Sequence, residues 1–476
     1  MTDSSFVATS VDGAAAEPTV KPRLRRVLGV GGLVLFGLAY MDPLAVFDTY
    51  GVVSQTTHGH VPTAYIVTFT AMLFTAGSYA VLVRAYPSAG SAYTFARRAF
   101  GGRVGFLTGW SLMLDYLLLP LINYLLIGIY LHALIPEVPA SVFCLIAIAL
   151  VTTVNVVGVV IMNRLNYVLV GLQLLFIVVF SVISLIYLRN NPGVSLLQPL
   201  YSSGFDGGDI FGGAAVVALS FLGFDAVSTM SEEARDPRRT VPIAIVLTVL
   251  AGGVIFLVVS YCATIIVPDY RSIDDPDSAA LQVVVAAGGH TLQNFFIVAY
   301  MCACGAAALS SQVSVTRILF AMGRDGVLPK AVFGRISRRF HTPIGAALVV
   351  SAISLFALIA DLETMASIVS FGALAAFTLV NLSVIKHFLI DLHRRGWRSW
   401  LVYAAMPTIG VALTGWLWTS LSMSAFAIGF SWMAVGLIYL AVITRGFRHS
   451  TPEVDFDAGE TPIEPDLTTS PERTPR

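Results

Sequence analysis

The chain has 476 residues, of which 56% are hydrophobic and only 12% are charged, about half the charged fraction of a typical soluble domain. Its acidic residues equal its Lys and Arg residues in number, so the formal net charge is zero. This composition predicts a multi-pass membrane protein and argues against nucleic acid as a partner.

Apolar stretches follow one another through most of the chain. A helix needs about 20 apolar residues to cross a bilayer, and twelve stretches meet this requirement, which predicts an all-α polytopic protein in the lipid bilayer. We expect a cytoplasmic tail at residues 1–26, a membrane domain at 27–445 and a disordered cytoplasmic tail at 446–476. The predicted spans are 28–55, 62–83, 104–134, 140–160, 165–188, 209–231, 241–267, 290–322, 343–361, 364–388, 399–419 and 423–445.

The basic residues indicate the orientation of these spans. Nearly all of them lie in the connections after the second, fourth, sixth, eighth and tenth spans, whereas the opposite loops contain only Arg189 and Arg271. Because basic loops stay in the cytoplasm, both termini are expected to face the cytoplasm, with the protein in the cytoplasmic (inner) cell membrane. The acidic outer loop 268–289 either serves solubility or provides a field that enriches cations at the entrance.

Two predicted spans contain a mid-membrane interruption beside an acid. In the first span, Pro43 removes a backbone hydrogen bond and follows Asp42. In the sixth, Gly223 weakens the helix two residues before Asp225. A simple kink and a packing glycine are the alternatives. Interruptions at corresponding positions of two halves favour a transporter binding site, since irregular backbone at this depth must line a cavity or be covered by protein.

The carboxylates themselves are the second signal. Asp42, Asp115 and Asp225 all lie within apolar spans. A charged side chain at the bilayer centre costs roughly 2.5–3.5 kcal/mol on insertion scales, and such residues usually face a solute path. We therefore expect a cationic solute or ion to pass beside them.

Motifs at the ends of the spans carry a family resemblance. The chain resembles the amino acid–polyamine–organocation transporters over about residues 27–445, and within that family the stretches 38–49, 58–65 and 114–116 look most like bacterial putrescine importers. The family motifs are Arg84-Ala-Tyr86-Pro87-Ser-Ala-Gly90-Ser-Ala-Tyr93; Gly223-Phe224-Asp225 with Glu232-Glu233-Ala-Arg235-Asp236-Pro237-Arg238 and Pro242; and Ser314-Val-Thr316-Arg317 with Met322-Gly323-Arg324-Asp325-Gly326, Pro329 and Thr342-Pro343.

The resemblance implies a fold of twelve transmembrane helices. Spans 1–5 and 6–10 would form two inverted five-helix repeats, followed by two extra helices. It also implies alternating access around a site between broken helices 1 and 6. The expected function is secondary active transport that imports a putrescine-like or polyamine-like amine. The alternative is an amino acid permease or exchanger of the same fold.

The first break departs from the pattern of amino acid carriers. Such carriers commonly place a Gly-Ser-Gly-like turn there, whose N–H groups receive a carboxylate. This chain has Ala39-Tyr40-Met41-Asp42-Pro43, which would repel a carboxylate and attract an ammonium group. Tyr40 and Phe224 can add cation–π contact, worth up to about 2 kcal/mol. The predicted substrate-binding residues are Ala39, Tyr40, Met41, Asp42, Pro43, Asp115, Tyr116, Ser220, Phe221, Gly223, Phe224 and Asp225.

The roles of the individual acids stay open at this point. Asp115 can hold the far ammonium of a diamine, exchange protons, or form an internal hydrogen bond. Asp225 belongs to a run that recurs in the family with different solutes, so an architectural role is favoured. We expect Asp48 near the exit of span 1. The predicted coupling and gating residues are Asp48, Glu232, Glu233, Arg235, Ser310 and Ser311.

Proton coupling is preferred to sodium coupling. The fifth span lacks the lysine that some proton-coupled relatives use, but a buried carboxylate such as Asp42 or Asp115 can take up a proton. Ser310 and Ser311 offer oxygens for sodium, although serines in membrane helices more often bond backbone.

Other classes of protein fit less well. The chain has no phosphate-binding Gly-Lys-Ser/Thr loop, and no third ligand accompanies the histidines at 58 and 60. No enzyme, cofactor or metal site is therefore expected. A channel would differ by conducting without saturation or counterflow.

Overall fold

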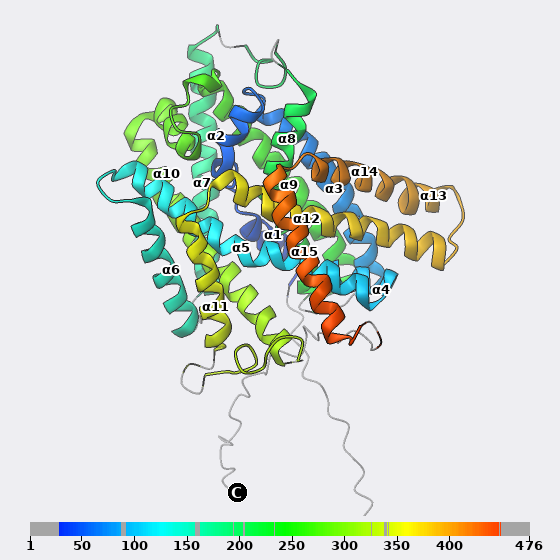
Figure 1. Cartoon of the computed structure of the whole chain (residues 1–476). Helices are drawn as coiled ribbons and strands as arrows, with labels where there is room; N and C mark the ends of the chain where they lie inside the picture. Colours follow the sequence, from blue (N-terminus) through cyan, green and yellow to red (C-terminus); the bar gives the residue numbers. More distant parts are fainter. Residues whose placement is uncertain are drawn as a thin grey trace, which may run out of the picture.

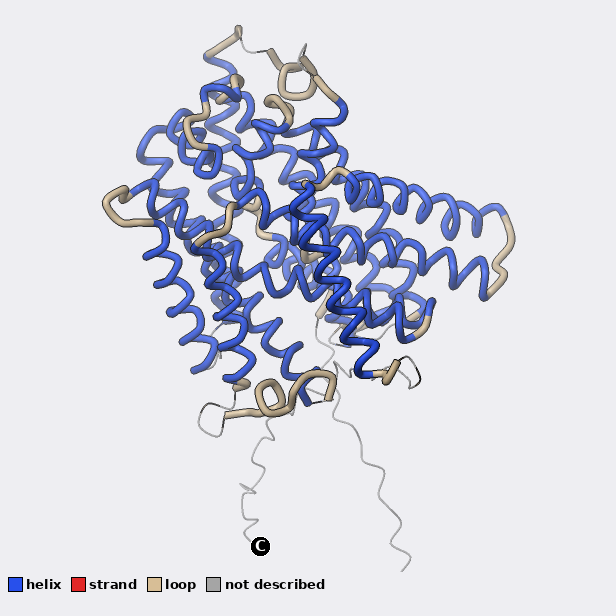
Figure 2. The backbone as a smooth tube through the Cα atoms, viewed as in Figure 1, coloured by secondary structure: helices blue, strands red, loops and turns tan. Residues whose placement is uncertain are grey.

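The computed structural model describes residues 28–86, 92–157, 162–193, 195–202, 205–232, 234–324, 326–337, 340, 342–446 and 448. All regular elements within these ranges are helices, and no strand occurs among them (Figure 2). The tails and part of the first motif, residues 87–91, lie outside the described residues.

The helices follow one another with short connections. The α-helices are α1 (Val30–Met41), α2 (Val46–Thr56), α3 (Val61–Ala85), α4 (Ala92–Phe100), α5 (Gly102–Leu134), α6 (Ala140–Val157), α7 (Met162–Asn190), α8 (Gly207–Val217), α9 (Pro237–Ile266), α10 (Ala279–Arg324), α11 (Ile344–Ser354), α12 (Leu362–Val384), α13 (Trp397–Trp400), α14 (Met406–Thr419) and α15 (Met423–Ile443). Short 3₁₀ or π segments are η1 (Ala218–Phe221), η2 (Asp225–Glu232), η3 (Tyr270–Ser272), η4 (Pro276–Ser278), η5 (Leu355–Leu358), η6 (Ile385–Asp391) and η7 (Leu401–Ala405).

The helix lengths agree with a multi-pass membrane protein. Within the described ranges, ten helical segments are long and apolar enough to cross a bilayer, and the bent pair α1 and α2 makes an eleventh. At the expected ninth span the chain forms a shorter apolar helix, Ile344–Leu358. The all-helical membrane fold is confirmed. The count of twelve spans and the inverted repeat stay predictions.

Two connections are more helical than the sequence suggested. The basic connection after α3 contains the helix α4, and the connection 268–289 contains η3, η4 and the start of α10. A kink separates this outer part of α10 from its membrane part, because Gly289 adopts φ 67°, which glycine tolerates without a steric penalty. Residues 279–287 are therefore helical instead of an open loop, and the start of this segment packs on α2 at Gly51.

The interrupted sixth span is the most enclosed one. In the segment Gly207–Ser231, 89% of the residues in the apolar window are buried, against 17% in Met423–Ile443. Figure 1 shows α1 near the middle of the bundle, with α13 and α14 extending to one side. The breaks thus lie in the protein interior, where irregular backbone is protected from lipid.

A polar cluster ties four helices around this interior. Tyr124 on α5 donates its hydroxyl to Gln312 Oε1 on α10, at 3.1 Å. The Gln312 amide donates in turn to Thr152 Oγ1 on α6, at 3.2 Å, and to Ser351 Oγ on α11, at 2.9 Å. A buried amide that has all these partners fixes the relative register of its neighbours. These helices therefore form a scaffold beside the broken spans.

The two broken spans also meet where the first begins and the sixth ends. Leu28, just before α1, and Ala234, just after η2, form a parallel bridge. The Arg235 N–H donates to the Leu28 carbonyl at 3.0 Å. The start of span 1 is thereby joined to the end of span 6 through the backbone.

Candidate functional site

The first break lies where Asp42 and Pro43 predicted it. The helix α1 ends at Met41, and Asp42 takes φ 51° and ψ 103°, a conformation that is uncommon outside glycine. The chain bends by 54° before α2 begins. The Asp42 carboxylate turns back on this bend and accepts a hydrogen bond from the Leu44 N–H at 3.0 Å. One role of Asp42 is therefore to satisfy an N–H group that the break exposes.

The second break is built in a similar way. The helix α8 tightens into η1, and Gly223 then adopts φ 112° before η2 begins at Asp225. The Asp225 carboxylate accepts from the Gly223 N–H at 3.3 Å. This bond supports the architectural role expected for Asp225, because the side chain caps the break in the same manner as Asp42.

The two breaks lie against each other. A Cβ atom added to Gly223 would stand 2.4 Å from Cδ1 of Tyr40, so only the absence of a side chain permits this approach. Ser220 Oγ donates to the Ala45 carbonyl at 3.4 Å and contacts the Tyr65 hydroxyl at 3.0 Å. Segments 39–45 and 220–225 thus share one buried region.

Asp115 on α5 approaches this region from the scaffold. Its carboxylate interacts electrostatically with Asp225 and with the hydroxyl groups of Tyr40 and Tyr116. The side chain is 6% exposed, and its Oδ1 atom has no hydrogen-bond partner in the described part of the chain. An unpaired buried polar group costs about 1–3 kcal/mol, which indicates a place for a ligand or a proton.

Two tyrosine hydroxyls near Asp115 are also buried without a hydrogen-bond partner in the described residues. The hydroxyl oxygens of Tyr40 and Tyr79 are buried and have no partner within the described residues. Both interact electrostatically with Asp115 and Asp225. Tyr79, on α3, was not among the residues predicted from the sequence. A tyrosine in an apolar span is a weak signal, because aromatic rings are common in helix packing.

The remaining residues predicted around the breaks have packing contacts. Phe224 lies between Tyr79 and Phe377, with ring centroids 5.6 and 5.1 Å away. Phe221 packs on Phe69 and Phe256. Met41 lies against Gly252 of α9. Pro43 is buried and Ala39 is half-buried. The rings of Phe221 and Phe224 therefore contribute to the apolar core on the α3 side of the breaks.

The predicted coupling residues are not gathered in one place. Asp48 accepts from the Tyr300 hydroxyl at 2.7 Å. Ser311 donates to the Ala307 carbonyl at 2.7 Å, the backbone bond that was the alternative to sodium binding. The backbone N–H of Arg235 bonds to Leu28. Ser310 is half-buried on α10. Glu233 and the side chain of Glu232 lie outside the described part.

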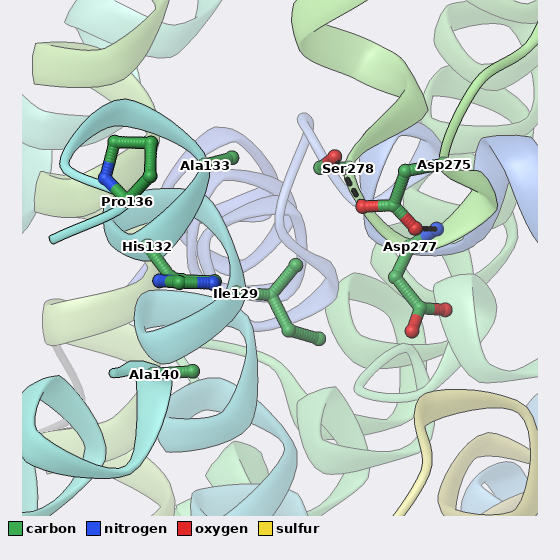
Figure 3. Close-up of a pocket in the computed structure, with 8 residues that line it drawn as sticks. All are labelled: Ile129, His132, Ala133, Pro136, Ala140, Asp275, Asp277 and Ser278. Atoms are coloured by element: carbon green, nitrogen blue, oxygen red, sulfur yellow. Dashed lines mark hydrogen bonds between the residues drawn. The ribbon is translucent and has the colours of Figure 1, made fainter. Parts of the chain in front are cut away.

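A pocket of about 430 Å³ lies outside this region, at the C-terminal end of α5 (Figure 3). One side comes from α5, the turn that follows it and the start of α6, and the acidic side comes from Asp275 and η4. The Asp275 carboxylate accepts from the Asp277 N–H at 3.2 Å and from Ser278 Oγ at 2.6 Å. The residues that line it are Ile129, His132, Ala133, Pro136, Ala140, Asp275, Asp277 and Ser278.

Histidine and cysteine chemistry is not assembled in the described ranges. Within them, no group of three His, Cys, Asp or Glu residues can hold a metal ion. The ring of His60 contacts the Thr57 carbonyl at 2.7 Å and Ser202 Oγ at 2.9 Å, and His58 contacts Asp209 at 3.2 Å. The two histidines therefore contact the chain at and just before α8, besides the neighbouring Thr57.

A helical membrane protein with two facing breaks and interior carboxylates has the architecture of a secondary transporter. The chain belongs to the amino acid permease family, whose sequence model matches residues 32–460.

Individual relatives extend over most of the chain. It is 38% identical to the low-affinity putrescine importer PlaP of Escherichia coli (strain K12), over 92% of this chain and 98% of that protein. It is 28% identical to the branched-chain amino acid permease BcaP of Bacillus subtilis, over 81% and 86%. It is 29% identical to cationic amino acid transporter 4 of Mus musculus, over 78% and 61%. These relatives are transport proteins, which confirms the expectation that the chain is not an enzyme.

The unpaired hydroxyl of Tyr40 leads to a first prediction. Tyr40→Phe is expected to raise the KM for uptake of the transported solute about tenfold or more, because a hydrogen bond to a charged group contributes about 1.5–3 kcal/mol. Its thermal unfolding temperature in detergent should equal or exceed that of the unsubstituted protein, since no paired hydroxyl is lost. Tyr124→Phe is the matched control, and it should lower the unfolding temperature without a change in KM. An unchanged KM in Tyr40→Phe contradicts a role in binding.

Proposed function

We propose that this chain is a secondary active transporter that imports a small organic amine, putrescine or a similar polyamine, across the cytoplasmic membrane. The observation that carries the proposal is the charge of the region between the breaks. In the described part of the chain, neither a salt bridge nor an electrostatic contact joins Asp42, Asp115 or Asp225 to a Lys or Arg. Buried charges need a compensating partner, and an ammonium group supplies it.

The chemistry of the first break distinguishes amines from amino acids. A zwitterionic amino acid brings a carboxylate, which the acids at 42, 115 and 225 would repel. A diamine brings an ammonium group at each end. Asp42 receives one of them in this proposal, and the unpaired oxygen of Asp115 receives the other, with Tyr40 and Tyr116 beside it. The identity to a putrescine importer supports the same substrate class.

The alternative is an amino acid permease or exchanger of the same fold. The similarity to BcaP and to a cationic amino acid transporter supports it. A cationic amino acid would place its side-chain charge near Asp115 but would still bring its carboxylate to the first break. The substrate test therefore compares compounds that differ in this carboxylate alone.

Competition for uptake decides between these substrates. In proteoliposomes that contain the purified protein, unlabelled putrescine and cadaverine should inhibit uptake of labelled putrescine. Lysine and ornithine, which add a carboxylate to the same diamine skeletons, should inhibit at least tenfold more weakly. Equal inhibition by ornithine and putrescine would favour the amino acid permease.

A substitution at the first break tests the anion itself. Asp42→Asn is expected to abolish putrescine uptake while the protein still inserts, because the amide keeps an acceptor for the Leu44 N–H and loses the charge. Glu363→Gln, at an exposed carboxyl of the helix α12, serves as the matched control and should transport normally. Unchanged uptake kinetics in Asp42→Asn remove this residue from the site.

We also propose proton-coupled symport by alternating access. The inner and outer halves of spans 1 and 6 would open the site to each side in turn, while α5, α6, α10 and α11 stay together through Gln312. The carboxyl group of either Asp42 or Asp115 would carry the proton. The distribution of basic residues supports cytoplasmic tails at 1–26 and 446–476, on either side of a membrane domain.

The coupling ion is tested with imposed gradients. In sodium-free buffer, a pH gradient that is acidic outside should drive accumulation of putrescine above equilibrium. A proton-conducting ionophore should abolish this accumulation. Strict dependence on sodium, with no response to the pH gradient, would reverse the assignment. Ser310 and the backbone around it would then be the candidate sodium ligands.

A further inference from the structure

Asp48 is an acid that the binding region above does not account for. It lies in the first turn of α2, toward the outer side of the first break, and is half-buried. Its Oδ1 atom accepts from the Tyr300 hydroxyl at 2.7 Å. In the described part of the chain no Lys or Arg faces it. Its charge instead adds to that of Asp42, with which it interacts electrostatically.

The surroundings of Asp48 hold the carboxylate in place. Tyr130 donates to the carbonyl of Phe47, the preceding residue, at 2.6 Å. The rings of Tyr130 and Tyr300 lie 4.5 Å apart, and Phe296 lies 5.0 Å from Tyr300. This aromatic wall lowers the local dielectric constant, so a cation that reaches the carboxylate interacts with it more strongly than in water.

The outer pocket and this carboxylate border the same two elements, α5 and the segment η4 that packs on α2. Ile129, which lines the pocket in Figure 3, is the neighbour of Tyr130 in α5. The segment η4, which supplies the other side of the pocket, packs directly on α2. A Cβ atom added to Gly51 would lie 2.1 Å from the Pro276 carbonyl. The charge of Asp275 reaches Tyr130 electrostatically. Acids are thus placed in succession from the pocket, through Asp48, to the first break.

We propose that Asp48 forms an outer subsite for a primary alkylammonium group, which a diamine occupies between the outer pocket and Asp42. Tyr300 is the positioning residue that orients the carboxylate. A diamine is the matching ligand, because two like-charged acids on one broken span are compensated together by two ammonium groups on one alkyl chain. This inference rests on the proposed amine transport, and it adds a step of substrate capture to it.

Two substitutions separate the charge of Asp48 from its hydrogen bond. Asp48→Asn keeps an oxygen that accepts from Tyr300 but removes the charge. Tyr300→Phe removes the hydroxyl and keeps the charge. Uptake of labelled putrescine into proteoliposomes is measured for both, together with the thermal unfolding temperature. A subsite for an ammonium group predicts a rise in KM of about tenfold or more in Asp48→Asn and a smaller rise in Tyr300→Phe.

A purely structural contact predicts the opposite order. In that case Tyr300→Phe lowers the unfolding temperature and impairs uptake, whereas Asp48→Asn stays close to the unsubstituted protein. That result overturns the subsite. Asp209→Asn, which removes another acid at the outer end of the bundle, is the matched control and should leave KM unchanged.

The controls also separate this inference from the function on which it rests. If the unsubstituted protein takes up no putrescine, the proposed function fails and the subsite fails with it. If the unsubstituted protein takes up putrescine, Asp42→Asn abolishes uptake, and Asp48→Asn keeps a normal KM, only the subsite is removed.

Discussion

Carboxylates without a basic partner in an apolar interior are the constraint on which the rest of this structure depends. Asp42 and Asp225 offset part of their burial by accepting hydrogen bonds from N–H groups at the two breaks. Asp115 has one oxygen with no partner among the described residues. Burial of such groups is costly unless a cation or a proton compensates them. The breaks, the neighbouring tyrosines and the surrounding scaffold all serve to hold these acids within reach of one another.

The helices and the two breaks could be predicted from the sequence, because each depends on residues that are close together in the chain. Proline and glycine do not always end a helix, since Pro120 lies inside α5, but Pro43 and Gly223 each stand beside an acid at corresponding positions of two spans, and this combination predicted the breaks. The apolar stretches likewise predicted the helical membrane fold. The helical segment 279–287 was missed, because it is too short to cross a bilayer and two glycines separate it from the apolar span that follows.

The contacts between distant segments were harder to predict. The bond between Tyr300 and Asp48 joins residues 252 positions apart. Tyr79 lies near Asp115 and Asp225 because that face of α3 is turned toward the breaks. Helix periodicity does not determine which face of one span meets which face of another. For the same reason the sequence could not tell that Phe224 packs between Tyr79 and Phe377. Residues whose role is set by the backbone next to them were predictable, whereas residues whose role is set by a facing helix were not.

The backbone bridge between Leu28 and Ala234 has a mechanical consequence. The inner end of α1 and the end of η2 are linked by a bond between main-chain atoms, which no side-chain substitution can remove directly. A displacement of either end therefore moves the other end with it, so the two segments are coupled mechanically. The residues with left-handed backbone at the two breaks, Asp42 and Gly223, stand at the other ends of these coupled segments. The two breaks therefore bound a single mechanical unit.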